Sequence, residues 1–237
     1  MAINTKYRTD RPEAMDDFAM EGEILKEALD KIASINKLLG GNNLTIEGVR
    51  ELLSNVSANN GITVLDVGCG NGDMLRTLAD YGIKHNLKFK LIGIDANQFT
   101  IDYAKQLSRS YPNISYRCED VFDDSFAELK YDIVLCTLTL HHFKDDEIVK
   151  LLSVFNANAK IGIVINDLQR SIVSYRLFQA LCFVFRLNDM SREDGLVSIL
   201  RGFKKEELIA FSKKANLKKY SIRWKWAFRY QWIISKI

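Results

Sequence analysis

The feature that most constrains this chain is a cluster of three glycines directly after an apolar run. Residues 62–65 read Ile-Thr-Val-Leu, and Gly68, Gly70 and Gly72 follow within the next seven residues. An apolar strand that ends in closely spaced glycines and then enters a helix is typical of a nucleotide-binding turn, because a Cβ would keep the backbone away from the ligand. The sequence therefore predicts an α/β fold with a nucleotide-like ligand at the end of its first strand.

The spacing of the glycines excludes two familiar motifs. A dinucleotide fingerprint needs a glycine at its sixth position, where this chain has Asp73, and the phosphate-binding loop G-x-x-x-x-G-K-[ST] is absent. The pattern that remains is D-x-G-x-G-x-G, and it begins at Asp66. It resembles the cofactor loop of the class I S-adenosylmethionine-dependent methyltransferases.

Strands and helices alternate after the glycine turn, which predicts a parallel sheet covered by helices on both faces. Residues 217–237 break the pattern, because two strand-like pieces follow each other there and predict a hairpin with one antiparallel strand. The expected fold is α/β, a doubly wound, mostly parallel seven-stranded sheet with a C-terminal antiparallel hairpin, as in the class I methyltransferases. We expect strands at 62–67, 89–95, 113–118, 131–136 and 160–166, and helices at 72–85, 97–109, 145–156 and 204–214.

Two segments fall outside this common core. Residues 1–59 form an expected N-terminal helical cap, with one helix within 13–39 that ends at Gly40-Gly41, a second at 45–53, and a turn at Asn59-Asn60-Gly61. Residues 60–237 form the expected methyltransferase domain. Within it, residues 168–203 make an insertion at the carboxyl end of a strand, where open α/β sheets bind ligands, and we expect it to act as a substrate lid.

The family resemblance implies S-adenosylmethionine as cofactor, S-adenosylhomocysteine as product, and a set of binding residues. Asp95 ends the second strand about twenty residues past the glycines, where an acid can accept hydrogen bonds from both ribose hydroxyls. Asp120 would accept from the adenine amino group with Val121 against the ring, although an acid at this position also caps helices in many proteins. Asp66 and Gly68 would serve the methionine end. The implied set is Asp66, Gly68, Cys69, Gly70, Gly72, Asp95, Ala96, Asp120, Val121 and Thr137.

Two adjacent histidines follow the strand at 131–136, at the mouth of the expected site. Methyl transfer to a hydroxyl benefits from a general base that titrates near neutral pH, usually histidine. Leu140-His141-His142-Phe143 is similar to the segment of caffeate-type small-molecule O-methyltransferases that carries their histidine base, and this alignment selects His141. The same pattern occurs in class I methyltransferases of other chemistry, so a structural role is the alternative.

The insertion contributes polar candidates for the substrate. Asp167 leaves the fifth strand, where it can orient a group or accept a proton, and Arg170 and Arg201 can hold an anionic group with Tyr175 nearby. This pattern is similar to bacterial methyltransferases of aromatic polyketide and pigment pathways. The alternative is that both arginines pair with local acids. The apolar side chains of residues 177–185 would suit an aromatic or alkyl-bearing acceptor, or else pack an amphipathic helix.

The composition of the chain argues against nucleic acid and membranes as binding partners. A net charge of +3 is too small to favour nucleic acid or an anionic membrane, and the alternating Trp and basic residues at 223–232 match a half-buried strand. Four scattered cysteines and a polar start at residues 1–17 predict a cytoplasmic protein without a transmembrane segment. We predict no metal ligand set, and the oligomeric state stays open, with a homodimer as one option.

The sequence therefore predicts an O-methyltransferase for a small phenolic, polyketide-like or quinol-like acceptor. The alternatives are methylation of nitrogen or carbon in another small molecule, a tRNA or a protein. A non-catalytic cofactor-binding scaffold is a third interpretation, although the intact glycine loop and Asp95 argue against it.

Overall fold

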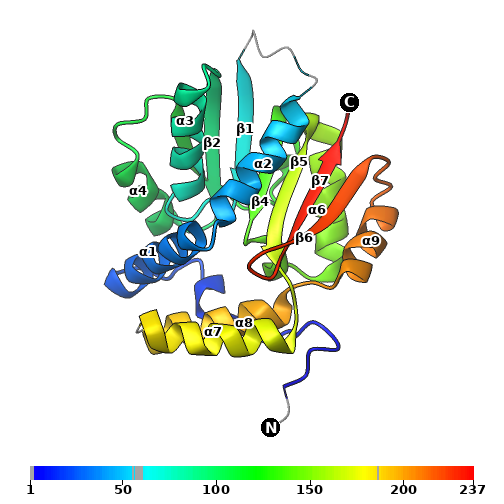
Figure 1. The fold of residues 1–237 in the computed structure, drawn as a ribbon. Coiled ribbons are helices and arrows are strands. Elements are labelled where there is room, and N and C mark those ends of the chain that lie inside the picture. Colours follow the sequence, from blue (N-terminus) through cyan, green and yellow to red (C-terminus); the bar gives the residue numbers. More distant parts are fainter. Residues whose placement is uncertain (1–2, 55, 57–60, 186) are drawn as a thin grey trace.

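The computed structural model describes residues 3–54, 56, 61–185 and 187–237, and it contains a seven-stranded sheet in the order β3-β2-β1-β4-β5-β7-β6. Strands β1 to β5 are parallel, and β7 pairs antiparallel with both β5 and β6 (Figure 1). The predicted doubly wound sheet with a C-terminal hairpin is confirmed. The strands are β1 (Ile62–Val67), β2 (Phe89–Asp95), β3 (Ile114–Cys118), β4 (Tyr131–Thr137), β5 (Ala159–Leu168), β6 (Tyr220–Lys225) and β7 (Arg229–Ser235).

Helices cover both faces of the sheet, and the sequence of β4 shows why. Its residues alternate between two apolar cores, with Ile133 and Leu135 in one and Val134 and Cys136 in the other. A strand buried on both faces needs such a continuous apolar run. The helices are α1 (Glu23–Leu38), α2 (Gly41–Leu53), α3 (Asp73–Lys84), α4 (Gln98–Leu107), α5 (Asp124–Ala127), α6 (Asp145–Asn158), α7 (Ile172–Phe185), α8 (Asp189–Arg201) and α9 (Lys205–Lys214), with the short 3-10 turns η1 (Ala14–Asp16) and η3 (Leu140–His142).

The N-terminal region differs from its prediction in detail. Helix α1 begins only at residue 23, because Gly22 adopts a φ of +96° that interrupts helical geometry, and η1 stands apart before it. Helix α2 begins at Gly41, four residues earlier than predicted. The predicted turn at Asn59-Asn60 lies outside the described residues.

Helix α2 joins the core of the sheet. Val49 and Leu52 are buried in the same apolar cluster as Val64 of β1 and Ile133 of β4. The division of the chain at residue 59 therefore stays a prediction, and at least α2 shares its packing with the strands.

The insertion is helical and lies at one end of the sheet. Figure 1 shows α7 and α8 side by side below the carboxyl ends of the parallel strands, with the dark blue N-terminal segment beside them. The amide of Thr9 donates to the carbonyl of Leu200 at 3.3 Å, which ties that segment to α8. None of the helices in the described part of the chain combines the length and apolar composition that a membrane crossing requires.

Candidate active site

A cavity of about 860 Å³ lies at the carboxyl ends of the parallel strands. Its walls come from the loops after β1, β2, β3, β4 and β5, from α1, and from the α7–α8 insertion. The segment before α1 and the turn between β6 and β7 complete it. Open α/β sheets bind their ligands at this edge, so the cavity is the candidate active site.

The glycine loop forms one wall of this cavity, with Gly68, Gly70 and Gly72 all at positive φ. A Cβ built on Gly70 would meet only Leu29 Cδ2, at 3.6 Å, so this face of the loop is open to the cavity. A side chain there would occupy ligand space and would also be strained at a φ of +51°. Gly72, in contrast, does not line the cavity.

Asp95 connects the glycine loop to the end of β2. Its Oδ2 accepts from the Gly70 amide at 3.1 Å and its Oδ1 accepts from the Asn97 amide at 3.0 Å. Burial raises the pKa of Asp95, and the hydrogen bonds from Asn97 and Gly70 oppose that rise. The carboxylate lines the cavity and is held in one orientation by the backbone on both sides.

Asp66 is the more deeply buried acid of this wall, with 2 % of its surface exposed. Burial, together with the negative charge of Asp95, raises the pKa of Asp66 to about 8. The side chain therefore carries a proton at neutral pH in the free protein, and it lines the cavity.

The loop after β3 forms the far end of the cavity. Asp120 and Val121 both line it, and the Phe122 amide donates to Asp120 Oδ1 at 2.9 Å, so Asp120 also organises its own turn. Both carboxylate oxygens of the neighbouring Glu119 already have partners, because Ser125 donates to Oε1 at 2.8 Å and Arg117 pairs with Oε2 at 3.0 Å. The other predicted cofactor residues that line the cavity are Cys69, Ala96 and Thr137.

His141 lies on the opposite wall and is held by Asp167. Its Nδ1 is 2.7 Å from Asp167 Oδ1, and its amide donates to Asp167 Oδ2 at 3.1 Å. Burial would raise the pKa of Asp167, but the opposing charge and hydrogen bond of His141 hold it below its ordinary value. Asp167 itself does not line the cavity, so it orients the imidazole from behind.

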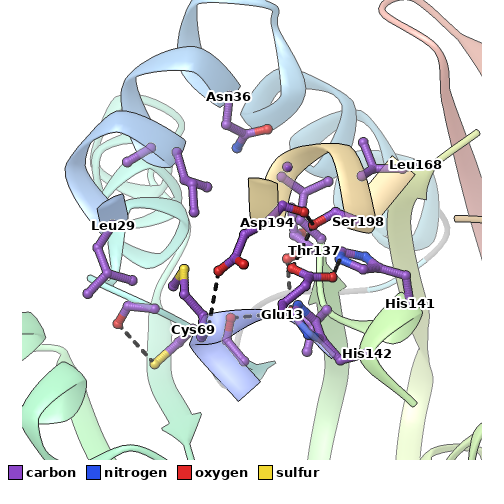
Figure 2. A pocket seen from close by; sticks show the side chains of 18 of the residues that line it. Glu13, Leu29, Asn36, Cys69, Thr137, His141, His142, Leu168, Asp194 and Ser198 are labelled. Carbon is purple, nitrogen blue, oxygen red and sulfur yellow. Dashed lines mark hydrogen bonds and ion pairs between the residues drawn. The ribbon is translucent and has the colours of Figure 1, made fainter. Parts of the chain in front are cut away.

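The free ring nitrogen of His141 faces a residue that the sequence did not single out. His141 Nε2 lies 3.7 Å from Glu13 Oε1, and neither of these buried atoms has a hydrogen-bond partner among the residues that the structure describes. Burial raises the pKa of Glu13, opposed by His142, Ser198 and Arg201. Glu13, His141 and Ser198 lie together at one end of the cavity, with Asn36 and Leu29 of α1 across from them (Figure 2).

Helix α8 holds Glu13 in place. Ser198 donates to Glu13 Oε2 at 2.7 Å, and Asp194 accepts from the amides of Ala14 and Met15 at 2.8 and 3.1 Å. The sequence did not predict Glu13 as a site residue. It lies far from the strands in the chain, and no pattern around it indicates that it reaches the edge of the sheet.

His142 is tied to the same segment. Its Nδ1 is 2.7 Å from Asp16 Oδ1. Burial would raise the pKa of Asp16, but hydrogen bonds from His142 and Arg201 hold it far below its ordinary value. One ligand atom each of Glu13, His141 and His142 lies within 4.8 Å of the others, as in a metal site. Arg201 Nη1 is 3.5 Å from Glu13 Oε1, and this positive charge disfavours a cation there.

The three predicted substrate residues of the insertion do not line the cavity. Arg170 donates to the carbonyls of Thr5, Lys6 and Gly202 and pairs with Glu207. Arg201 pairs with Asp16 and donates to the carbonyls of the two histidines, and Tyr175 lies half-buried on α7. Both arginines therefore follow the alternative of pairing with local groups, and we leave Arg170, Tyr175 and Arg201 out of the proposed site.

Part of the predicted apolar lid reaches the cavity. Leu177, Phe178 and Leu181 line it, whereas Phe183 and Val184 lie on the surface with 87 % and 73 % exposed. Aromatic side chains from elsewhere join them in the wall, namely Phe18, Trp226 and Phe228.

Comparisons with known proteins agree with this geometry. Residues 64–162 match a family model described as a methyltransferase domain. A ubiquinone biosynthesis O-methyltransferase from Coxiella burnetii is 33 % identical over 85 residues, which are 35 % of this chain and 34 % of that protein. The match thus spans about a third of the curated relative's length.

Solved structures share the fold over nearly the whole chain. The plantazolicin methyltransferase BpumL in complex with S-adenosylhomocysteine aligns with a TM-score of 0.67 at 17 % identity, covering 90 % of each chain. Magnesium protoporphyrin IX methyltransferase from Synechocystis PCC 6803 aligns with a TM-score of 0.53 at 16 % identity, covering 93 % of this chain and 87 % of that one. The predicted resemblance to class I methyltransferases is confirmed, and these distant structures establish the fold.

Proposed function

We propose that this chain is an S-adenosylmethionine-dependent O-methyltransferase that acts on a small phenolic, polyketide-like or quinol-like acceptor. The methyltransferase-domain match, the fold and the cavity at the carboxyl edge support this activity. A cytoplasmic location stays a prediction from composition.

The glycine-loop wall fits the cofactor. The open face of Gly70 admits a ligand against the backbone, and Asp95 presents a carboxylate beside it, suited to a ribose diol. Asp120 and Val121 would border the adenine, and Asp66 and Gly68 the methionine part. When bound, S-adenosylmethionine supplies an electrophilic methyl group on a sulfonium.

The observation that carries the proposal is the pairing of His141 with Asp167. A buried imidazole whose Nδ1 is held by a carboxylate presents Nε2 as the proton acceptor, and within the described part of the chain this Nε2 has no hydrogen-bond partner. The acceptor hydroxyl would pass its proton to Nε2 as its oxygen bonds to the methyl carbon, and the electrons of the broken carbon–sulfur bond return to sulfur. Asp167 stabilises the resulting imidazolium.

Glu13 completes this end of the site. A hydroxyl oxygen about 2.8 Å from both His141 Nε2 and Glu13 Oε1 would fill the gap of 3.7 Å between two unpartnered atoms. The one proton of that hydroxyl goes to Nε2, so Glu13 would act as a positioning residue in its protonated form, by donating to the hydroxyl oxygen. The aromatic side chains in the cavity wall support an aromatic body for that acceptor.

Substitution of the dyad tests the proposal. His141→Ala should lower kcat for methyl transfer to a panel of phenols by roughly 10²–10⁴-fold, the usual contribution of a general base. Asp167→Asn should also lower kcat, because the amide no longer stabilises the imidazolium. Binding of S-adenosylmethionine, measured by calorimetry, should be retained in both variants.

The control is His85→Ala, which removes an exposed histidine after α3. It should match the wild-type protein in rate and binding. If His141→Ala keeps wild-type turnover from pH 6 to 9, His141 is structural and the proposed mechanism is wrong.

A further inference from the structure

Arg229 is a buried cation for which the described part of the chain provides no hydrogen-bond partner. Its side chain begins β7, and the residue is 3 % exposed. The Nε and Nη1 atoms are buried without a hydrogen-bond partner, and Arg229 lines the cavity. An unpaired guanidinium out of water is costly, so a protein keeps one where a ligand supplies the missing charge.

The other buried arginines of the described residues differ from Arg229 in having partners. Arg170 and Arg201, the remaining arginines buried in the described residues, both pair with carboxylates and donate to backbone carbonyls. No carboxylate of the described residues lies within ion-pair distance of Arg229, in contrast. The protein is thus able to satisfy a buried arginine, and at Arg229 it does not.

Asp167, the acid whose charge acts on Arg229, already accepts hydrogen bonds from other groups. The charge of Asp167 raises the pKa of Arg229, which burial lowers to about 10. The oxygens of Asp167, however, accept from the ring and amide of His141 and from the Leu168 amide. Asp167 therefore compensates His141, and Arg229 stays protonated and unpaired at neutral pH.

The surroundings of Arg229 fix its position. In the sheet, Arg229 pairs with Leu168 of β5 on one side and with Lys225 of β6 on the other. A Cβ built on Gly41 would lie 2.7 Å from Arg229 Nη1 and 1.9 Å from Asn36 Oδ1, so the guanidinium, the Asn36 amide and the start of α2 converge on one spot. Asn36 is also buried and lines the cavity, and its Oδ1 accepts no hydrogen bond from the described residues.

We propose that Arg229, beside Asn36, is the receptor for a carboxylate of a ligand bound in the cavity. A guanidinium whose Nε and Nη1 donors are unsatisfied offers a positive charge and N–H groups to a carboxylate. Two sources share this chemistry: the carboxylate of the cofactor's methionine part, and an acidic group on the acceptor. The assignment rests on the proposed function, because that function brings these ligands to the cavity.

Calorimetry with the wild-type protein and Arg229→Met tests the proposal and separates the sources. If the cofactor supplies the carboxylate, the variant should bind S-adenosylmethionine about tenfold or more weakly and decarboxylated S-adenosylmethionine as well as the wild type does. If the acceptor supplies it, both cofactor forms should bind normally, and the variant should lose binding of 4-hydroxybenzoate to the protein loaded with S-adenosylhomocysteine.

Stability distinguishes a receptor from a structural residue. The ligand-free Arg229→Met variant should melt at or above the wild-type temperature, because an unpaired buried charge is removed. The matched control Arg170→Met should melt well below it, because it leaves Glu207 and three carbonyls without their donor. Arg229→Lys, which keeps the charge but not the fork, should bind the carboxylate ligand more weakly than the wild type.

Unchanged binding of all three probes in Arg229→Met would overturn the proposal, as would an equal loss for both cofactor forms. A wild-type protein that binds no S-adenosylmethionine would instead overturn the proposed function. The two failures are therefore distinguishable.

Discussion

Three aspartates in or beside this site differ in the pKa of their carboxyl groups because their surroundings differ. Asp167 has a histidine against it, and its pKa lies below the ordinary value. Asp66 has only burial and a neighbouring acid, and its pKa rises to about 8. Asp95 lies between these cases, with its pKa raised by burial and opposed by two amides. Near neutral pH, Asp167 is therefore ionised and Asp66 is protonated, because their surroundings shift their pKa values in opposite directions.

The proton on Asp66 predicts a pH-dependent stability. Between about pH 4 and 8 the folded ligand-free protein holds a proton that the unfolded chain has released, so the free energy of unfolding falls as pH rises. The contribution is at most about 1.4 kcal/mol per pH unit. Asp66→Asn should make this slope shallower in urea unfolding measured from pH 5 to 8, while the raised pKa values of Asp95 and Glu13 keep part of it. Asp189→Asn, at an exposed acid, should keep it; equal slopes for wild type and Asp66→Asn would contradict the prediction.

Asp95 predicts an effect on cofactor affinity. Asp95→Ala removes the carboxylate that would meet the ribose and also frees the Gly70 amide, so S-adenosylmethionine should bind several-fold or more weakly in calorimetry. The control Asp102→Ala changes an exposed acid of α4 and should bind normally. Unchanged affinity in Asp95→Ala would remove Asp95 from the cofactor site.

At the scale of elements, the site depends on a short segment docked by a helix from the other end of the chain. Within the turn η1, Asp16 Oδ2 accepts from the Glu13 amide at 3.0 Å, and Asp194 of α8 accepts from the first two amides of the turn. Arg8 extends the docking, because it donates to the carbonyls of His141 and Phe143. Glu13 thus reaches His141 only while α8 and η1 stay together.

Because Asp194 holds η1, the Asp194→Ala variant should lose amide protection in η1 and turnover but keep its affinity for the cofactor. Ala14 and Met15 should exchange their amide hydrogens about tenfold faster, because the local opening energy falls by roughly 1–2 kcal/mol with the lost acceptor. Turnover should fall as Glu13 loses its position, whereas cofactor affinity should hold. Asp189→Ala, on the exposed first turn of the same helix, is the control. Wild-type exchange at both amides would show that α8 does not hold η1.

At the scale of the whole molecule, the sheet could be predicted because its information is local. The apolar run Tyr131-Asp-Ile-Val-Leu-Cys marks a strand buried on both faces, and β4 occupies it. The glycines follow the first strand and Asp95 ends the second, as is typical of cofactor-binding α/β folds. Periodicity could not show that Gly22 interrupts the first helix, since a single φ decides it.

The substrate side could be predicted only in part, because it is built from long-range contacts. His141 and Asp167 follow adjacent strands, so the sequence brought both to one edge, but not their distance of 2.7 Å. Glu13 enters through docking of the N-terminal segment onto α8, and Arg229 comes close to Asn36 and Gly41 from the start of β7; no local pattern encodes either contact. Sequence reasoning chose Arg170 instead, and it could not see that carbonyls and Glu207 already surround this side chain.

The position of β7 between β5 and β6 has a consequence for biosynthesis. The edge of β5 that β7 covers stays open while about 60 further residues, from Leu168 to Arg229, are translated, which takes roughly 3–12 s at 5–20 residues per second. An uncovered strand edge is a template for aggregation. Each nascent chain therefore passes through a period of several seconds in which this edge of β5 can pair with a foreign strand.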